Sequence, residues 1–167
     1  MKELNITNLE ALNIVAWYKQ LSEDAKNEIP FKIRWALKRA IAKFEPTASD
    51  FEKFRDEELS KIQTNFFDDE KSYEAMLPKV DADGNEEKDA DGNVLTVEGR
   101  KIKEEYMQEY NNEIAALNKK LNEILMEKST YEFNGVNFDE YLDELEGVSH
   151  LKFNDIEMMD LILGEAA

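Results

Sequence analysis

Hydrophobic positions at the start of the chain predict a short strand followed by a helix. Leu4 and Ile6 alternate with polar residues, as in a strand with one buried face. Thr7 and Glu10 have the spacing of a capping box, in which each residue satisfies a free backbone N–H group at a helix start. We therefore expect a strand around Leu4–Ile6 and a helix over about 8–21.

Two prolines delimit the next predicted helix. Pro30 suits the first helical position, and Pro46 is expected to end the helix, which gives a helix over about 30–44. One stripe of this segment is apolar: Ile33, Leu37, Ala40, Ile41 and Phe44. Basic residues flank the stripe: Lys32, Arg34, Lys38, Arg39 and Lys43. The pattern is typical of a helix with one buried face and a basic surface.

The middle of the chain predicts a helical hairpin with an acidic insert at its tip. Ser49 and Glu52 form a second capping-box pattern and predict a helix over about 50–64. Residues 65–95 lose periodicity and contain a doubled Asp-Ala-Asp-Gly-Asn segment, so we expect an acidic, turn-rich insert. A helical period then returns over 97–127, along the seam Ile102, Tyr106, Tyr110, Ile114, Leu117, Leu121 and Ile124.

The last part of the chain predicts one β-hairpin and short helices. Residues 131–138 alternate large and polar side chains around Asn134-Gly135, which is typical of a two-residue hairpin turn. A short acidic helix is expected over 139–145. Asn154 is expected to cap a final helix over 155–163.

Together these elements predict the fold class. We expect an α+β fold that is predominantly helical, in a single domain over 1–167. It would combine a long antiparallel helical hairpin with a small antiparallel β element near the chain ends. Strand Leu4–Ile6 or residues Leu151–Phe153 would supply the pairing that one hairpin lacks alone.

Charge divides the chain into regions of opposite sign. The chain has 38 Asp and Glu against 21 Lys and Arg, a net charge of −17. Residues 1–45 nevertheless carry 8 basic against 6 acidic residues, whereas 46–95 carry 6 against 15 and 129–167 carry 1 against 10. Such polarity bears on the choice of partner and not on chemistry.

Composition excludes several kinds of site. The chain has no Cys, which removes disulfides and thiolate catalysis and fits the cytoplasm. His150 is the only histidine, so a di-iron bundle or a His-Glu-x-x-His zinc site cannot form in one chain. Ser149 adjoins His150, but neighbours on a strand face opposite ways and would make a poor nucleophile and base. We expect no cofactor, no membrane span and no direct binding of nucleic acid.

The doubled Asp-rich segment is the only candidate for a metal site. Its candidate calcium ligands are Asp81, Asp83, Asn85, Asp89, Asp91 and Asn93. An EF-hand loop needs Gly at its sixth position and Glu at its twelfth, where this chain has Glu86 and Gly92. Ordinary Asp-Gly turns are therefore favoured over an ion site.

A resemblance to a known family rests on the order of these elements and on two segments. The segment Glu28-Ile29-Pro30-Phe31-Lys32 enters the basic helix, and residues 151–163 read Leu-Lys-Phe-Asn-Asp-Ile-Glu-Met-Met-Asp-Leu-Ile-Leu. In this arrangement the chain resembles a family of small, acidic, uncharacterised proteins of tailed phages and prophages. The resemblance implies an infected-cell or virion setting and carries no catalytic residues.

Three functional hypotheses follow. The first is a non-catalytic protein that acts through protein–protein contacts or self-association, in a structural, assembly or adaptor role. Its candidate partner-binding residues are Phe31, Lys32, Trp35, Lys38 and Arg39, because aromatic residues bordered by basic ones often anchor interfaces. The alternative is that Phe31 and Trp35 pack under the first helix or the long hairpin, and it is favoured because large aromatic side chains are usually buried. The second is an acidic inhibitor that mimics nucleic acid before a DNA- or RNA-binding protein. The third is an enzyme that uses carboxylates of its many acidic residues, such as Asp139, Glu140, Asp143 and Glu144.

Overall fold

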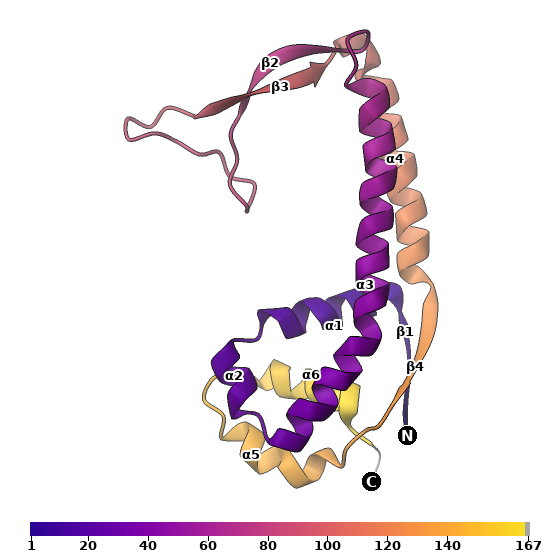
Figure 1. The fold of residues 1–167 in the computed structure, drawn as a ribbon, viewed down its shortest axis with the longest axis vertical. Helices are drawn as coiled ribbons and strands as arrows, with labels where there is room; N and C mark the ends of the chain where they lie inside the picture. The colour runs from indigo at the N-terminus through magenta and orange to yellow at the C-terminus, as the bar shows by residue number, and fades with distance from the viewer. Residues whose placement is uncertain (166–167) are drawn as a thin grey trace. The chain divides into compact units, whose positions relative to one another are not determined.

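The computed structural model describes residues 1–165, and its elements follow one another as Figure 1 shows. They are β1 (Lys2–Thr7), α1 (Asn8–Gln20), α2 (Glu23–Glu28), α3 (Phe31–Phe66), β2 (Ser72–Pro78), β3 (Thr96–Ile102), α4 (Glu104–Met126), β4 (Lys128–Phe133), the 3₁₀ helix η1 (Phe138–Tyr141), α5 (Leu142–Glu146) and α6 (Phe153–Leu163). The predicted α+β, predominantly helical class is confirmed.

The chain forms two compact units. The first contains Met1–Phe54 and the chain from Leu121 onward, and the second contains Arg55–Lys120. Helices α3 and α4 each contribute residues to both units.

The start of the first unit follows the predicted capping box. Thr7 Oγ1 accepts a hydrogen bond from the Glu10 N–H at 3.1 Å, and the Thr7 N–H donates to Glu10 Oε2 at 2.7 Å. Both groups are satisfied, so β1 ends and α1 begins at one defined residue. Ser22 caps α2 in a similar way, by accepting from the Ala25 N–H at 3.1 Å.

The core of the first unit lies along the apolar stripe of α3. Ile33, Leu37, Ala40, Ile41 and Phe44 are all buried, as the sequence predicts. They pack with buried residues from the strands and the other helices: Leu4, Ile6, Ala11, Ile14, Val15, Phe133, Phe138, Leu145, Ile156, Met159, Ile162 and Leu163. Burial of this stripe fixes which side of α3 faces solvent.

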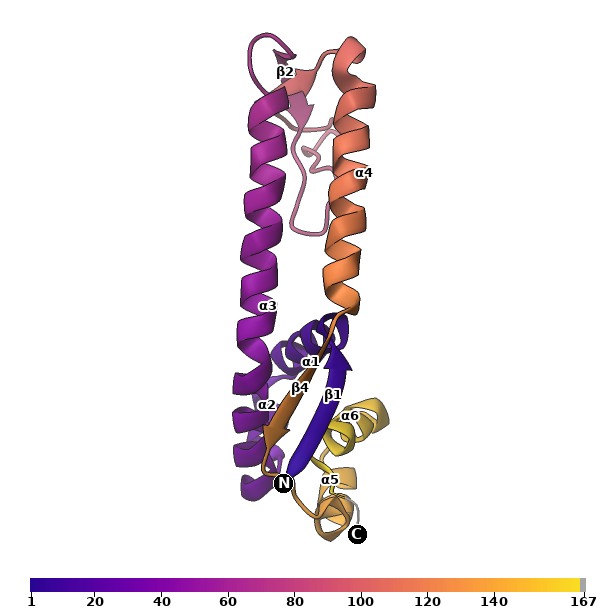
Figure 2. The same cartoon turned by 90° about the vertical axis from the view of Figure 1, so that its right-hand side faces the viewer.

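Strand β4 covers part of the same helix. It pairs antiparallel with β1, with Leu4 opposite Tyr131. The Phe44 ring lies 4.7 Å from the Tyr131 ring and 5.9 Å from the Phe133 ring, between centroids and in edge-on geometry. The Tyr131 hydroxyl also lies 2.8 Å from Thr47 Oγ1. These contacts join β4 to α3, the two elements that Figure 2 shows next to each other in the lower part of the view.

Helix α6 closes the first unit, and its start differs from the prediction. The Asp155 carboxylate accepts from the Lys152 N–H at 2.9 Å and from the Trp17 indole N–H at 2.9 Å. The predicted cap at Asn154 is therefore wrong, because α6 begins at Phe153 and Asp155 satisfies the N–H group of Lys152, three residues earlier. Asp155 also joins α1 to α6. The predicted apolar face is confirmed, since Ile156 and Met159 are buried.

Helix α3 runs through Pro46, so the predicted end at residue 44 and the predicted new start at Ser49 are wrong. Proline lacks an N–H group and leaves the Ala42 carbonyl without its usual helical partner. Both Ala42 and Pro46 are exposed, so water can solvate that carbonyl. Buried Phe44 and Ala48 hold the helix to the core on either side of the proline.

The second unit contains the end of α3, the β2–β3 hairpin and most of α4. The Phe66 ring is buried and lies 5.4 Å from the Tyr110 ring of α4, between centroids. Arg100 on β3 donates to Ser72 Oγ at 2.9 Å and to Asp69 Oδ1 at 2.9 Å. The predicted reversal between two helices is thus present, with the acidic insert between them.

The predicted helix over 97–127 begins too early. Residues 96–102 form β3, which pairs antiparallel with β2, with Val97 opposite Leu77. Thr96, Val97 and Ile102 are β-branched and suit a strand once β2 supplies a partner. Helix α4 starts at Glu104, where two acidic residues in the first turn favour a helix N-terminus.

The predicted hairpin over 131–138 does not form. Asn134-Gly135 follows β4, but neither residue has the positive φ that a type I′ turn requires. The Val136 N–H instead donates to the Leu163 carbonyl at 2.9 Å, and the Glu165 N–H donates to the Val136 carbonyl at 3.1 Å. Strand β4 itself pairs with β1, and the residues after β4 bond to the end of α6. Of the two predicted partners, Leu4–Ile6 is correct and Leu151–Phe153 is not.

Candidate protein-binding groove

The geometry of α3 places its aromatic and basic residues on one side. Side chains four positions apart share a helix face, which brings together Phe31, Trp35 and Arg39. The buried stripe through Ile33 and Leu37 occupies the opposite side. Phe31 and Trp35 must therefore project away from the core that anchors the helix.

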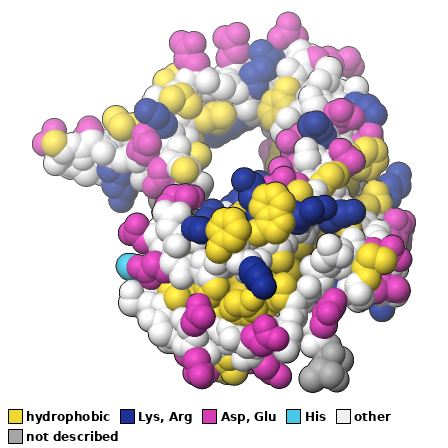
Figure 3. Space-filling model, turned by 60° about the horizontal axis from the view of Figure 1, so that its bottom comes forward, with side chains coloured by type: hydrophobic (Ala, Val, Ile, Leu, Met, Phe, Trp, Pro, Cys, Tyr) yellow, Lys and Arg dark blue, Asp and Glu magenta, His cyan; other side chains and the backbone are white. Residues whose placement is uncertain are grey.

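Phe31 and Trp35 are more exposed than most large apolar side chains. Phe31 is 73% exposed and Trp35 is 55% exposed. Figure 3 shows hydrophobic side chains flanked by Lys and Arg on the face that it turns forward. Large aromatic side chains usually lose most of their water contact on folding, so the exposure of these two neighbours makes this face the candidate for an interaction surface.

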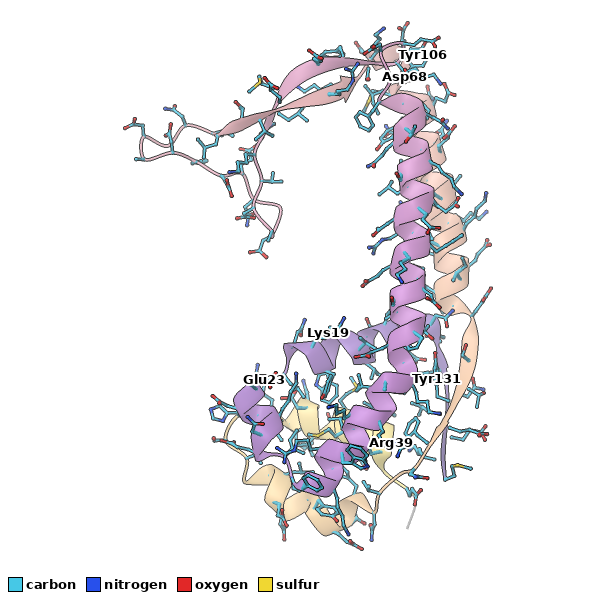
Figure 4. All side chains as sticks on the ribbon, viewed as in Figure 1. Lys19, Glu23, Arg39, Asp68, Tyr106 and Tyr131 are labelled. Atoms are coloured by element: carbon cyan, nitrogen blue, oxygen red, sulfur yellow. The ribbon has the colours of Figure 1, made fainter. Side chains whose placement is uncertain are left out.

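The aromatic face of α3 lines a groove that β4 and the segment after it complete. The groove has a volume of about 430 Å³. Its α3 side consists of Phe31, Lys32, Trp35, Ala36, Arg39 and Lys43, and its other side of Met1, Glu132, Phe133, Asn134, Gly135 and Val136. Figure 4 labels Arg39 on α3 and Tyr131 on β4, and so locates the two elements that border it. We call this feature the α3–β4 groove.

The groove has an excess of positive charge. Lys32, Arg39 and Lys43 line it against one carboxylate, that of Glu132. Within residues 1–165, none of these three basic side chains forms an ion pair. The Arg39 guanidinium lies 5.8 Å from the centre of the Trp35 ring, a cation–π contact that holds charge next to an apolar surface.

Four of the five candidate residues line the groove together: Phe31, Lys32, Trp35 and Arg39. Lys38 is exposed but lies outside it. Sequence reasoning missed Lys43, although the four-residue spacing from Trp35 and Arg39 points to it. It also missed the β4 side, because no local pattern predicts which strand lies beside α3.

The Asp-rich insert forms two copies of one turn. The Asp81 carboxylate accepts from the Asp83 and Asn85 N–H groups, each at 2.9 Å, and Gly84 has a φ of +82°. The second copy repeats these bonds from Asp89 to the N–H groups of residues 91 and 93, also at 2.9 Å. The first Asp of each copy thus organises its own backbone. In residues 1–165 no cluster of three or more Asp, Glu or His side chains has an arrangement that could hold a metal ion.

Ser149 and His150 contact each other, contrary to the expectation that they face apart. They lie in a turn, where Ser149 Oγ is 3.3 Å from His150 Nδ1. The Glu28 carboxylate lies 3.2 Å from the same nitrogen. A catalytic relay needs the acid and the nucleophile on different ring nitrogens. These exposed side chains therefore form a surface contact without that geometry.

The acidic residues considered for catalysis lie in solvent. Asp139, Glu140, Asp143 and Glu144 are all exposed on η1 and α5. Across residues 1–165, every buried side-chain nitrogen or oxygen has a hydrogen-bond partner. No helix in the same residues has the length and apolar composition needed to cross a bilayer.

Comparisons with protein-family models, with curated proteins and with solved structures found no match to this chain. The functional argument therefore depends on the α3–β4 groove itself.

Proposed function

We propose that this chain is a non-catalytic, phage-type protein that acts through protein–protein contacts, in a structural, assembly or adaptor role. The observation that supports this proposal most strongly is the exposure of Phe31 and Trp35 next to basic side chains that form no ion pair within residues 1–165. Burying such aromatic side chains against a partner stabilises a complex more than most other contacts do. Its setting would be the cytoplasm of the infected cell or the virion.

The arrangement on α3 also separates binding from folding. The core stripe anchors the helix through one side, and the aromatic residues project from the other. A partner can therefore cover Phe31 and Trp35 without any change in the core. This separation allows binding and stability to be tested independently.

Substitution of Trp35 tests the proposal, with Phe153 as a matched control. Phe153 is 71% exposed but lies on α6, outside the groove. In pull-downs from cells that express the tagged chain, Trp35→Ala should release a protein partner or a second copy, whereas Phe153→Ala should retain it. Both variants should keep the wild-type melting temperature, because both side chains are exposed. Equal retention by the two variants would exclude the groove as the binding site.

Acidic mimicry of nucleic acid is the alternative, and salt discriminates it. Residues 129–167 carry 10 acidic residues and 1 basic residue. If these acids hold a nucleic-acid-binding partner, its retention should fall steeply as the salt concentration rises, and Trp35→Ala should not change it. A partner anchored by Trp35 should be lost on that substitution and resist salt.

A further inference from the structure

Strand β4 has an open edge beside the groove, within residues 1–165. β4 has β1 as its only strand partner within residues 1–165. The Asn8 N–H donates to the Glu127 carbonyl at 2.9 Å, immediately beyond the paired residues. Hydrogen-bonded pairs recur every second residue, so the odd-numbered residues of β4 bond to β1. The N–H and C=O groups of Thr130 and Glu132 therefore point to the other, open edge.

This open edge leads into the α3–β4 groove. Glu132 and the four residues after it line one side of the groove, and α3 lines the other. Thr130 and Glu132 are both exposed, so a strand could reach their backbone groups. An unpaired edge is a ready template for an added strand.

We propose that the open edge of β4 and the α3–β4 groove together bind an extended, acidic peptide segment of a partner protein, with a bulky apolar side chain against Phe31 and Trp35. This inference rests on the proposed function and names the chemistry of the partner. Strand addition supplies backbone hydrogen bonds, and the groove selects alternate side chains.

Charge complementarity determines the acidic character of the segment. Lys32, Arg39 and Lys43 line the groove and form no ion pair within residues 1–165. Carboxylates on the added strand would pair with these groups. The orientation of β4 also agrees with this proposal. Tyr131 and Phe133 contact Phe44 of α3, so the side chains of odd-numbered β4 residues face the helix. Alternate side chains of an added strand would project to that same side.

A single-stranded nucleic acid is the competing occupant, since aromatic and basic residues also bind bases and phosphates. Two observations favour the peptide. Only a peptide backbone can complete the pairing of Thr130 and Glu132. A polyphosphate would also meet the acidic remainder of the chain, whose net charge is −17.

Selection from a library of random linear peptides tests the chemistry. We expect the full chain to enrich peptides that combine several Asp or Glu with one bulky apolar residue. Arg39→Glu should weaken a selected peptide by about tenfold or more, whereas Lys53→Glu, an exposed charge on α3 outside the groove, should change its affinity little. Three results would overturn the proposal. In the first, the full chain enriches basic peptides instead of acidic ones. In the second, it enriches no peptide more than the Trp35→Ala variant does. In the third, an oligothymidylate binds more tightly than a selected peptide.

Amide hydrogen exchange tests the edge. A selected peptide should slow exchange at Thr130 and Glu132. The matched controls are Glu3 and Asn5, which lie opposite these residues and direct their N–H groups to the open edge of β1. Protection at Glu3 and Asn5, or at neither edge, would refute strand addition. If the peptide result fails while Trp35→Ala still releases a protein partner, only this inference is lost; if Trp35→Ala has no effect, the proposed function fails as well.

Discussion

At the scale of single residues, the side of α3 on which a residue lies separates the buried core residues from the exposed aromatic residues. Phe44 is fully buried and contacts the rings of Tyr131 and Phe133. Trp35, on the same helix, is 55% exposed and contacts the Arg39 guanidinium. The periodicity of the sequence places the apolar stripe and the aromatic pair on opposite sides of one helix, but the exposure of the pair is known only from the structure.

Two residues with the same capping-box pattern provide a test of the helix boundaries. Thr7→Ala should lower the free energy of unfolding by about 1 kcal/mol, because Thr7 caps α1. Ser49→Ala should be neutral or slightly stabilising, since Ser49 lies inside α3 and alanine is the better helix former. Urea unfolding of both variants measures the difference. A loss of about 1 kcal/mol at Ser49 would instead place a helix start there.

At the scale of elements, local sequence patterns predict an element well where contacts with other elements do not change its conformation or its ends. The capping box at Thr7 and the buried stripe of α3 needed only local sequence. The predictions made from Pro46 and from Asn134-Gly135 were wrong because tertiary contacts outweigh local preference. The core holds α3 on both sides of Pro46, so the helix continues. Strand β4 pairs with β1 and not with the residues after Asn134-Gly135. β3 escaped detection because its strand character depends on β2.

Pro46 should reduce the stability of the helix that it interrupts. Pro46→Ala restores one N–H donor inside α3 and should raise the free energy of unfolding by about 2 kcal/mol. This figure is a net value. Proline also restricts the unfolded chain, and losing that restriction cancels about 1 kcal/mol of the stability gained in the folded helix. Chemical denaturation measures the change, and circular dichroism should show no loss of helix. A destabilised variant would indicate that Pro46 ends a helix.

At the scale of the whole molecule, one net charge conceals a local exception. The chain is strongly acidic, but α3 carries no Asp or Glu between Phe31 and Lys43. Three of the five basic residues there, Lys32, Arg39 and Lys43, line the α3–β4 groove, whereas the acids of η1 and α5 are exposed elsewhere in the first unit. Sequence alone locates the basic segment, but only the fold shows that β4 completes a groove beside it. In the proposed function, this patch would select and orient a partner of opposite charge.

Site-specific photo-cross-linking in cells tests the central claim most directly. A photoreactive phenylalanine analogue at position 31, in the groove, should form a covalent adduct with a protein. The same analogue at position 153, which is similarly exposed on α6, should not form that adduct. Adducts of equal yield at both positions, an adduct with nucleic acid at position 31, or no adduct at position 31 would contradict the account.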